Sequence, residues 1–323
     1  MSIEPNSQKK FNRGFLVALL SAVVLSFTAI LILMISQNYQ LPALILAYWR
    51  EVFVAFSLLP ALLIVKPVLL RLEKRDLLFM VLFGLVLAFF NTFWTLSVTL
   101  SGASVATVLV YCSGAFTAIL GWWLLKETLG WQKIIAVILC LAGAIFVSGA
   151  THPAAWEANP LGIISGILSG LMYAVYSLMG RTATQRGINP WTALFYTFLF
   201  ASVFMLGANL IPGNAIPGSA STPSELFILG DRWAAWLLLF LLAAGPTLLG
   251  FGLYNISLSL LPSSTTNLIV TIEPVFTAIT AYFLLDERLS TLELLGSGLI
   301  LIALVILRVR IGPKRTLRFS DKA

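Results

Sequence analysis

Residues 256–289 read ISLSLLPSSTTNLIVTIEPVFTAITAYFLLDERL, an apolar stretch with Glu273 and Pro274 near its middle. A shift of 160 positions lays residues 96–129, LSVTLSGASVATVLVYCSGAFTAILGWWLLKETL, over this stretch. The shared letters include the run FTAI and the aligned glutamates Glu127 and Glu287. Apolar composition alone would match some leucines but not these features, so we interpret the two stretches as copies of one internal repeat.

The composition indicates a membrane protein, because 59% of the chain is hydrophobic, 10% is charged and the mean hydropathy is +0.97. Apolar runs close to the ~20 residues that cross a ~30 Å hydrocarbon layer recur along the whole chain. We therefore predict an all-α integral membrane protein with ten transmembrane helices. The expected spans are 14–36, 42–65, 77–99, 104–125, 132–150, 161–180, 191–211, 233–258, 264–285 and 291–308.

The repeat predicts two inverted halves of five helices each. Because five is an odd number, the second half must cross the membrane in the opposite sense to the first. The charges agree, since Lys126 aligns with Asp286 and Lys133 with Glu293. Inverted repeats are typical of transporters that work by alternating access. The expected segments are a cytoplasmic N-terminal tail (1–13), a first repeat (14–150), an external linker (151–160), a second repeat (161–308) and a basic cytoplasmic tail (309–323).

Lys and Arg residues predict the orientation of the chain. In the ten-helix arrangement, all 20 of them except Arg50, Arg232 and Arg288 lie on one side. Basic residues are retained on the cytoplasmic side during insertion. We therefore expect a multi-pass protein of the cytoplasmic membrane with both termini in the cytoplasm. The net charge of +7 then reflects topology and attraction to anionic lipid, without a nucleic-acid partner.

Three motifs resemble a known family. They are EPVFTAITAYFLLDERLS (273–290), GAFTAILGWWLLKETLG (114–130) and AYWREVF (47–53). Together they resemble the EamA-type permeases of the drug/metabolite transporter superfamily, over nearly the whole chain. The resemblance implies a ten-helix fold with a central cavity and the export or import of small metabolites. The chain departs from the family pattern at Ser113-Gly114, where the first repeat often has a proline, so a break matching that at Pro274 is not expected there.

Charged residues inside the spans are candidates for the transport site. Pro274 predicts a helix kink near Glu273, and the energetic cost of a charge at mid-bilayer predicts that Glu273 faces the bundle interior. Glu273 is either a proton- or substrate-binding carboxylate or a structural partner of a buried cation such as Arg50. Arg50 either forms a static bridge or binds a substrate carboxylate. Glu51 is rotated by ~100° from Arg50, so we expect only one of the two to line the cavity.

Aromatic and amide side chains within the spans are further candidates. Aromatic faces with a few amides suit a small amphipathic solute, although ordinary helix packing is the alternative at each position. These residues are Asn91, Trp94, Tyr111, Tyr173, Tyr176, Tyr254 and Asn255. Trp122 and Trp123 are expected at the membrane interface. Glycines spaced by four in GIISGILSG (162–170) predict close helix packing.

Enzyme chemistry has little support in the sequence. His152 is the sole histidine, Cys112 and Cys140 lie in separate spans, and no phosphate-binding glycine loop occurs. We expect no catalytic residue, metal or cofactor.

The predicted function is secondary transport of amino-acid-like or drug-like metabolites by alternating access, with export favoured and protons as a candidate coupling ion. The alternative is an uncoupled facilitator or exchanger for amino acids or related solutes, and a channel ranks lower. The partners are then a small solute and lipid, and the oligomeric state stays open.

Overall fold

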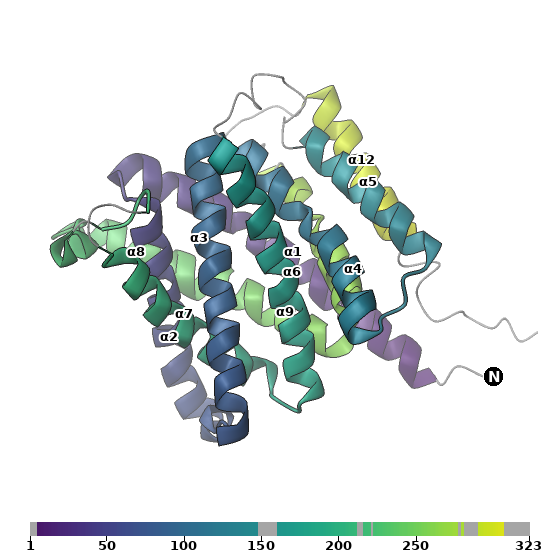
Figure 1. Ribbon diagram of the computed structural model, residues 1–323, viewed down its shortest axis with the longest axis horizontal. Helices are drawn as coiled ribbons and strands as arrows, with labels where there is room; N and C mark the ends of the chain where they lie inside the picture. Colours follow the sequence, from purple (N-terminus) through teal and green to yellow (C-terminus); the bar gives the residue numbers. More distant parts are fainter. Residues whose placement is uncertain are drawn as a thin grey trace, which may run out of the picture.

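The computed structural model describes residues 5–147, 160–211, 216–220, 222–276, 279–280 and 290–306. Within these ranges the chain is helical, without β-strands, and its helices form a bundle (Figure 1). Six helical stretches are long and apolar enough to cross a membrane: 8–28, 43–65, 74–97, 160–185, 190–209 and 233–260. Shorter apolar helices cover 109–125, 131–146 and 294–306. The described part of the chain is therefore that of a multi-pass membrane protein.

The first two helices are α1 (Pro5–Tyr39) and α2 (Ala43–Val65), followed by the short helix η1 (Pro67–Leu70). Residues 5–13 of the predicted N-terminal tail belong to α1. Proline is tolerated in the first turn of a helix, and no helix-breaking residue follows Pro5 before the apolar run begins. The basic residues of this segment therefore lie on the first turns of a helix.

The next boundary differs from the prediction. The helix α3 (Lys74–Tyr111) continues through residues 100–103, where a connection was expected, and α4 (Ser113–Leu125) begins after Cys112. Only Gly102 in the expected connection disfavours a helix, by about 1 kcal/mol, which is too little to end one. The helix α5 (Trp131–Val147) completes the first half.

The second half begins with α6 (Pro160–Gln185) and α7 (Pro190–Asn209). After η3 (Pro223–Phe227), the predicted span 233–258 is one continuous helical stretch. It consists of α8 (Trp233–Leu242), the π-helical turn η4 (Ala243–Thr247) and α9 (Leu248–Leu260). Pro246 lies inside the π turn, which accommodates its missing backbone donor. The last described helices are α10 (Ser263–Val270) and α12 (Thr291–Ile306).

Two helix breaks fall at matching positions of the repeat. The first is Cys112, between α3 and α4, and the second is Thr271 and Ile272, after α10. A shift of 160 positions places Cys112 on Ile272. Pro274 stands in the first turn of the helical segment that resumes at Glu273, where its missing N–H is not needed. The predicted kink near Glu273 is therefore a break just before it, and a matching break occurs in the first half without a proline.

Gly170 of α6 explains how the first break is packed. A methyl group at this position would lie 2.8 Å from the Leu109 carbonyl oxygen and 3.3 Å from the Ser113 nitrogen. The backbone of the break therefore rests directly on α6, as the predicted glycine spacing in this helix indicates.

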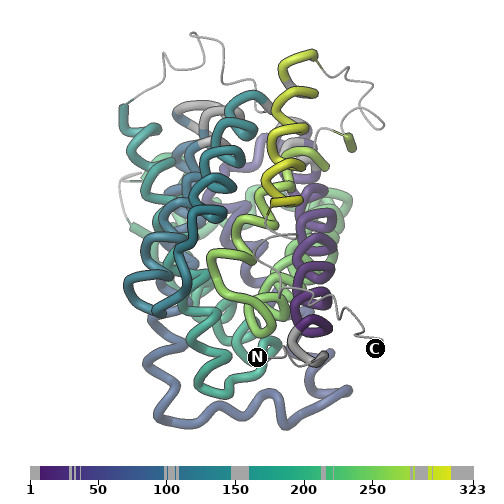
Figure 2. The backbone as a smooth tube through the Cα atoms, turned by 90° about the vertical axis from the view of Figure 1, so that its right-hand side faces the viewer, coloured from purple at the N-terminus to yellow at the C-terminus, as the bar shows by residue number. Residues whose placement is uncertain are grey.

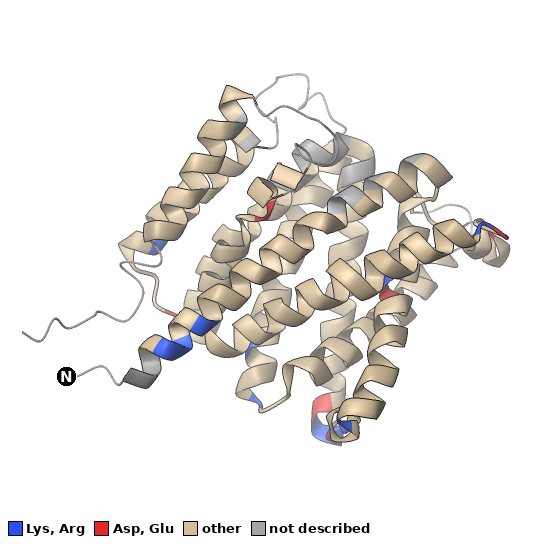
Figure 3. Ribbon diagram, turned by 180° about the vertical axis from the view of Figure 1, so that it is seen from behind, with Lys and Arg blue, Asp and Glu red and all other residues tan. Residues whose placement is uncertain are grey.

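The connections gather at two ends of the bundle. At one end, Arg186 after α6 lies 3.4 Å from Asp76 at the start of α3, and Arg181 donates to the Leu258 carbonyl 2.9 Å away. At the other end, the Trp49 indole donates to Leu226 in the connection after α7. Figure 3 shows most of the Lys, Arg, Asp and Glu positions at the helix ends, with few in the middle of the bundle. The connection after α6 and the start of α3 therefore lie at one end of the bundle, and the connection after α7 lies near the start of α2.

The helices pack in neighbouring pairs. Contacts join α3 to α6 and α7, α1 to α9, and α2 to α7. The pair of α5 and α12 lies along one edge of the bundle, where Figures 1 and 2 both show the two helices side by side. Two clusters of buried apolar residues fill the described part of the bundle, and buried polar residues lie among its helices. The next section describes those that contact one another.

Candidate functional site

Three buried polar side chains meet between α2 and α3. Arg50 Nη2 donates to Asn91 Oδ1 at 2.6 Å, and Asn91 Nδ2 donates to Glu51 Oε1. Arg50 Nη2 and Glu51 Oε1 lie 3.8 Å apart. All three residues are at least 94% buried. We call Arg50, Glu51 and Asn91 the charged cluster.

The charged cluster corrects one prediction. Arg50 and Glu51 do not point to separate environments, because both reach the amide of Asn91 on the neighbouring helix. The angle of ~100° between successive residues applies to the Cβ atoms. The long arginine side chain can bend back across that angle. The Asn91 amide then binds both residues, because its oxygen accepts from Arg50 and its nitrogen donates to Glu51.

Two atoms of the charged cluster have unmet hydrogen-bonding capacity. Arg50 Nε, a donor, and Glu51 Oε2, an acceptor, are buried without a hydrogen-bond partner among the residues that the structure describes. Such groups are rare, since an unsatisfied buried polar group costs about 1–3 kcal/mol and more when charged. The cluster therefore offers one cationic donor and one anionic acceptor to a further group.

Three tyrosines stack beside the charged cluster. Tyr173 of α6 stacks on Tyr254 of α9 with ring centroids 5.7 Å apart, and on Phe90 of α3 at 5.1 Å. Tyr176 lies one turn along α6, 6.3 Å from the Tyr254 ring. Tyr176 and Tyr254 are fully buried, whereas Tyr173 is partly exposed. We call Tyr173, Tyr176 and Tyr254 the tyrosine cluster.

Hydroxyl and amide groups connect the tyrosine cluster to α10 and α4. The hydroxyls of Tyr254 and Ser177 are 2.6 Å apart. Asn267 of α10 donates to Ser177 at 3.3 Å and to Tyr254 at 3.5 Å, and it accepts from Ser113, the first residue of α4, at 3.3 Å. One amide therefore joins both broken helical regions to the tyrosines.

The two clusters adjoin each other through α3 and α6. Asn91 follows Phe90, whose ring stacks on Tyr173, and Glu51 lies within electrostatic range of the Tyr176 hydroxyl. Glu273, directly after the second break, lies within electrostatic range of Tyr173 and of Tyr111, the last residue of α3. The structure thus brings together candidates from five helical segments.

The other two candidates from the sequence, Asn255 and Trp94, differ in their contacts. Asn255 accepts a hydrogen bond from the Tyr176 hydroxyl at 3.4 Å, and its amide nitrogen is buried without a described partner. Trp94 is partly buried and packs against the apolar core. Within the described ranges, no hydrogen bond or ring contact joins Trp94 to the tyrosine cluster, so apolar packing suffices to explain this residue.

Small polar residues at this centre were not singled out from the sequence. Asn267, Ser177 and Ser113 carry most of the hydrogen bonds around Tyr254. The run SSTTN at 263–267 was the available signal, because five successive polar residues at the start of an apolar span are unusual. A lone serine in a span gives no such signal.

These features define a class: a multi-pass helical membrane protein with a buried polar centre. Comparison with known sequences identifies the family. The sequence model of the EamA-like transporter family matches residues 12–149 and 160–309. The chain therefore belongs to the EamA-like transporter family, as its motifs predicted, and it is a transporter rather than an enzyme.

Relatives with curated names are also transporters. The chain is 25% identical over 241 residues to a protein of Rickettsia prowazekii (strain Madrid E) named S-adenosylmethionine uptake transporter, with 75% of this chain and 74% of that protein covered. An uncharacterized transporter of Archaeoglobus fulgidus is 28% identical over 145 residues, which are 45% of this chain and 47% of that protein. This second match thus spans about half of the relative.

The fold is also found among solved structures. One crystal structure superposes with a TM-score of 0.71 over 94% of this chain and 99% of its own, at 15% sequence identity. At this level of identity the likeness concerns the fold alone.

Proposed function

We propose that this protein is a ten-helix secondary transporter that moves zwitterionic, amino-acid-like metabolites across the cytoplasmic membrane. Its two halves act as inverted repeats that rock about a central site, with both termini in the cytoplasm. The observation that carries the proposal is the charged cluster, in which neighbouring Arg50 and Glu51 each keep one buried polar atom, Nε and Oε2, without a partner among the described residues. An α-amino acid offers a carboxylate to the first and an ammonium group to the second.

The neighbouring tyrosine cluster favours a solute that carries an aromatic or polar group in addition to its α-amino-acid group. Partly exposed Tyr173 offers an aromatic edge, and Asn255 offers an unused amide donor. S-Adenosylmethionine, named for the Rickettsia relative, combines an α-amino acid with a planar base. We therefore include this compound among the solutes to test, together with the amino acids.

The direction and coupling of transport form the finer part of the proposal. The family resemblance favours export, whereas the Rickettsia relatives are named for uptake. Glu51 and Glu273 are the carboxylates that can carry a coupling proton, since Glu51 is fully buried and partly buried Glu273 lies within electrostatic range of Tyr173. The second candidate function is an uncoupled facilitator or exchanger, which uses the same site without a proton.

Counterflow in sealed proteoliposomes tests the mechanism. Vesicles loaded with unlabelled solute should accumulate external labelled solute transiently and saturably, because one site alternates between the two sides. A transmembrane pH gradient should change the rate several-fold in the coupled transporter, and this effect should disappear when Glu51 or Glu273 is replaced by glutamine. Flux that ignores the gradient supports the uncoupled exchanger. Voltage-driven flux without saturation would indicate a channel and contradict both candidates.

A further inference from the structure

The turn between α4 and α5 is fastened to the start of α10 by one carboxylate. Glu127 Oε1 accepts hydrogen bonds from the Ser263 backbone nitrogen at 2.6 Å and from the Ser263 hydroxyl at 2.7 Å. Glu127 Oε2 accepts from the Ser264 backbone nitrogen at 3.2 Å and also from the Ser264 hydroxyl. Glu127 thus binds two of the backbone donors that every helix leaves free at its N-terminus.

A buried lysine completes this contact. Lys133, in the first turns of α5, donates to the Ser264 hydroxyl oxygen at 2.7 Å and lies 3.9 Å from Glu127 Oε2. The side chains of Lys133 and Glu127 are only 3% and 8% exposed. Burial of Lys133 is possible because its positive charge lies close to the Glu127 carboxylate. We call Glu127, Lys133, Ser263 and Ser264 the clasp.

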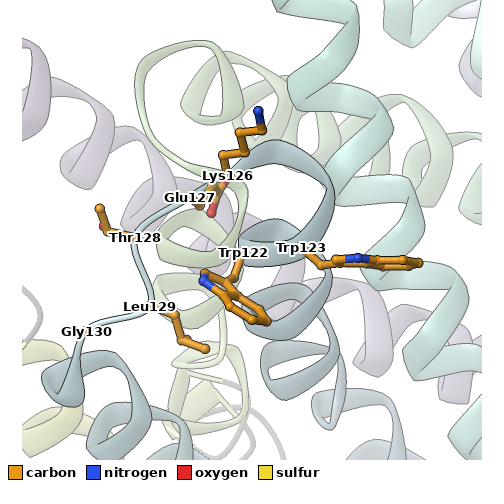
Figure 4. Close-up of a pocket in the computed structure, with 7 residues that line it drawn as sticks. All are labelled: Trp122, Trp123, Lys126, Glu127, Thr128, Leu129 and Gly130. Carbon is orange, nitrogen blue, oxygen red and sulfur yellow. The ribbon is translucent and has the colours of Figure 1, made fainter.

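The shape of the turn directs Glu127 to α10. Lys126 has a left-handed backbone with φ of 53°, and the Glu127 nitrogen donates to the Gly121 carbonyl at 3.0 Å. A methyl group on Gly121 would lie 3.0 Å from Glu127 Oε2, so this position leaves room for the carboxylate. Figure 4 shows Trp122 and Trp123 pointing to different sides of the α4 end. Both residues line a surface hollow of about 610 Å³.

The clasp joins the two halves of the chain at one end of the bundle. Glu127 and Lys133 come from the first half, and the two serines come from the second. Asn267, which binds Ser113, Ser177 and Tyr254, lies one turn further along α10. A displacement of the α10 start would therefore move the residue that holds the tyrosine cluster together.

We propose that Glu127 is a positioning residue that latches this end of the bundle shut. When the carboxylate is bound to Ser263 and Ser264, α10 is held against the α4–α5 turn and Asn267 is kept at the tyrosine cluster. When the bonds are released, the α10 start leaves the turn and opens a path to the site from the side that carries the basic connections. The transport role of this latch rests on the proposed function, whereas the latch itself can be measured without any solute.

A cysteine reporter on α10 tests the latch. Thr265 is 1% exposed, and its hydroxyl has no described partner, so Thr265→Cys introduces a thiol of similar size in a background of Cys112→Ala and Cys140→Ala. The rate of labelling by a water-soluble maleimide should rise about tenfold or more in Glu127→Gln, because local opening exposes the thiol. Gly121→Ala should raise it as well, by displacing an unaltered Glu127. Labelling rates within about twofold of the parent in both variants would overturn the latch.

Matched controls distinguish a local opening at the α10 start from a destabilisation of the whole bundle. Gly207→Ala is the control for Gly121→Ala, because a methyl group at Gly207 meets no atom within 4 Å. Leu229→Cys, 1% exposed in the connection after α7, reports on the other end of the bundle. Its labelling should stay unchanged in Glu127→Gln, and an equal rise at both reporters would contradict a latch. Increased labelling of Thr265→Cys without counterflow of any solute would leave the latch standing and remove the proposed function.

Discussion

At the scale of single residues, two amide side chains at the centre of the bundle bind polar groups on other helices. Asn91 on α3 binds Arg50 and Glu51 of α2. Asn267 on α10 binds Ser177 of α6 and Tyr254 of α9. In hydrocarbon such bonds stabilise by about 0.6 kcal/mol on average and up to about 1.7 kcal/mol. A substitution at this centre is therefore expected to change solute binding more than it changes stability.

Tyr254→Phe tests this expectation. The variant loses the 2.6 Å contact with Ser177 but keeps the ring stacking, so the free energy of unfolding should fall by only about 1 kcal/mol. Solute affinity should fall at least several-fold, because Ser177 and Asn267 lose their common partner.

Tyr196→Phe is the control for Tyr254→Phe. Its hydroxyl makes a bond of similar length, 2.7 Å to the Leu70 carbonyl, at the end of the bundle. A similar loss of stability without a change in affinity is expected there. Equal affinity changes in the two variants would remove the tyrosine cluster from the site.

The sequence could predict part of this centre. Arg50, Glu51, Asn91, Tyr176 and Tyr254 were identifiable because charged, amide and phenol groups are unusual in apolar spans. The partners of these groups could not be predicted, because they lie far along the chain. Ser113 and Ser177 look unremarkable until segments 77 to 154 residues apart are placed side by side. The repeat marks Glu127 in the sequence but does not identify its partners Ser263 and Ser264.

At the scale of elements, apolar length predicted where the chain is helical, but it did not predict where the helices end. The connection expected at 100–103 is helical, and the break occurs at Cys112, where no proline or glycine precedes it. The cause lies in another helix, since Gly170 lets the carbonyls of Leu109 and Val110 approach α6. The end of α10 was closer to the prediction because Pro274 acts locally.

Gly170→Ala tests the packing of the first break. The added methyl group would lie 2.8 Å from a backbone carbonyl oxygen, which cannot move aside as a side chain can. We expect the free energy of unfolding to fall by about 1–3 kcal/mol, the usual effect of overpacking. Gly207→Ala, measured by the same denaturation assay, should have little effect. A melting temperature of Gly170→Ala equal to that of the parent would show that α6 does not support the break.

At the scale of the whole molecule, the chain folds as a helical bundle of the EamA-like transporter family, with two clusters of buried polar residues inside the bundle. The charged cluster and the tyrosine cluster lie at the centre, and the clasp lies at one end, on the same short helix that carries Asn267. In the proposed mechanism, this arrangement links closure of one end of the bundle to the shape of the transport site. Glu287, which the repeat aligns with Glu127, lies outside the described residues.

The claim that the charged cluster binds a zwitterion is tested most directly by thermal stability in detergent. The purified protein is screened against the amino acids and S-adenosylmethionine, and each stabilising solute is compared with its methyl ester and its N-acetyl derivative. A bound solute at 100 times its dissociation constant adds about 2.7 kcal/mol to stability. We predict that the zwitterion raises the melting temperature, that both derivatives lose the effect, and that Arg50→Gln abolishes it. A solute that stabilises equally well as ester, as N-acetyl derivative and in Arg50→Gln would contradict the claim.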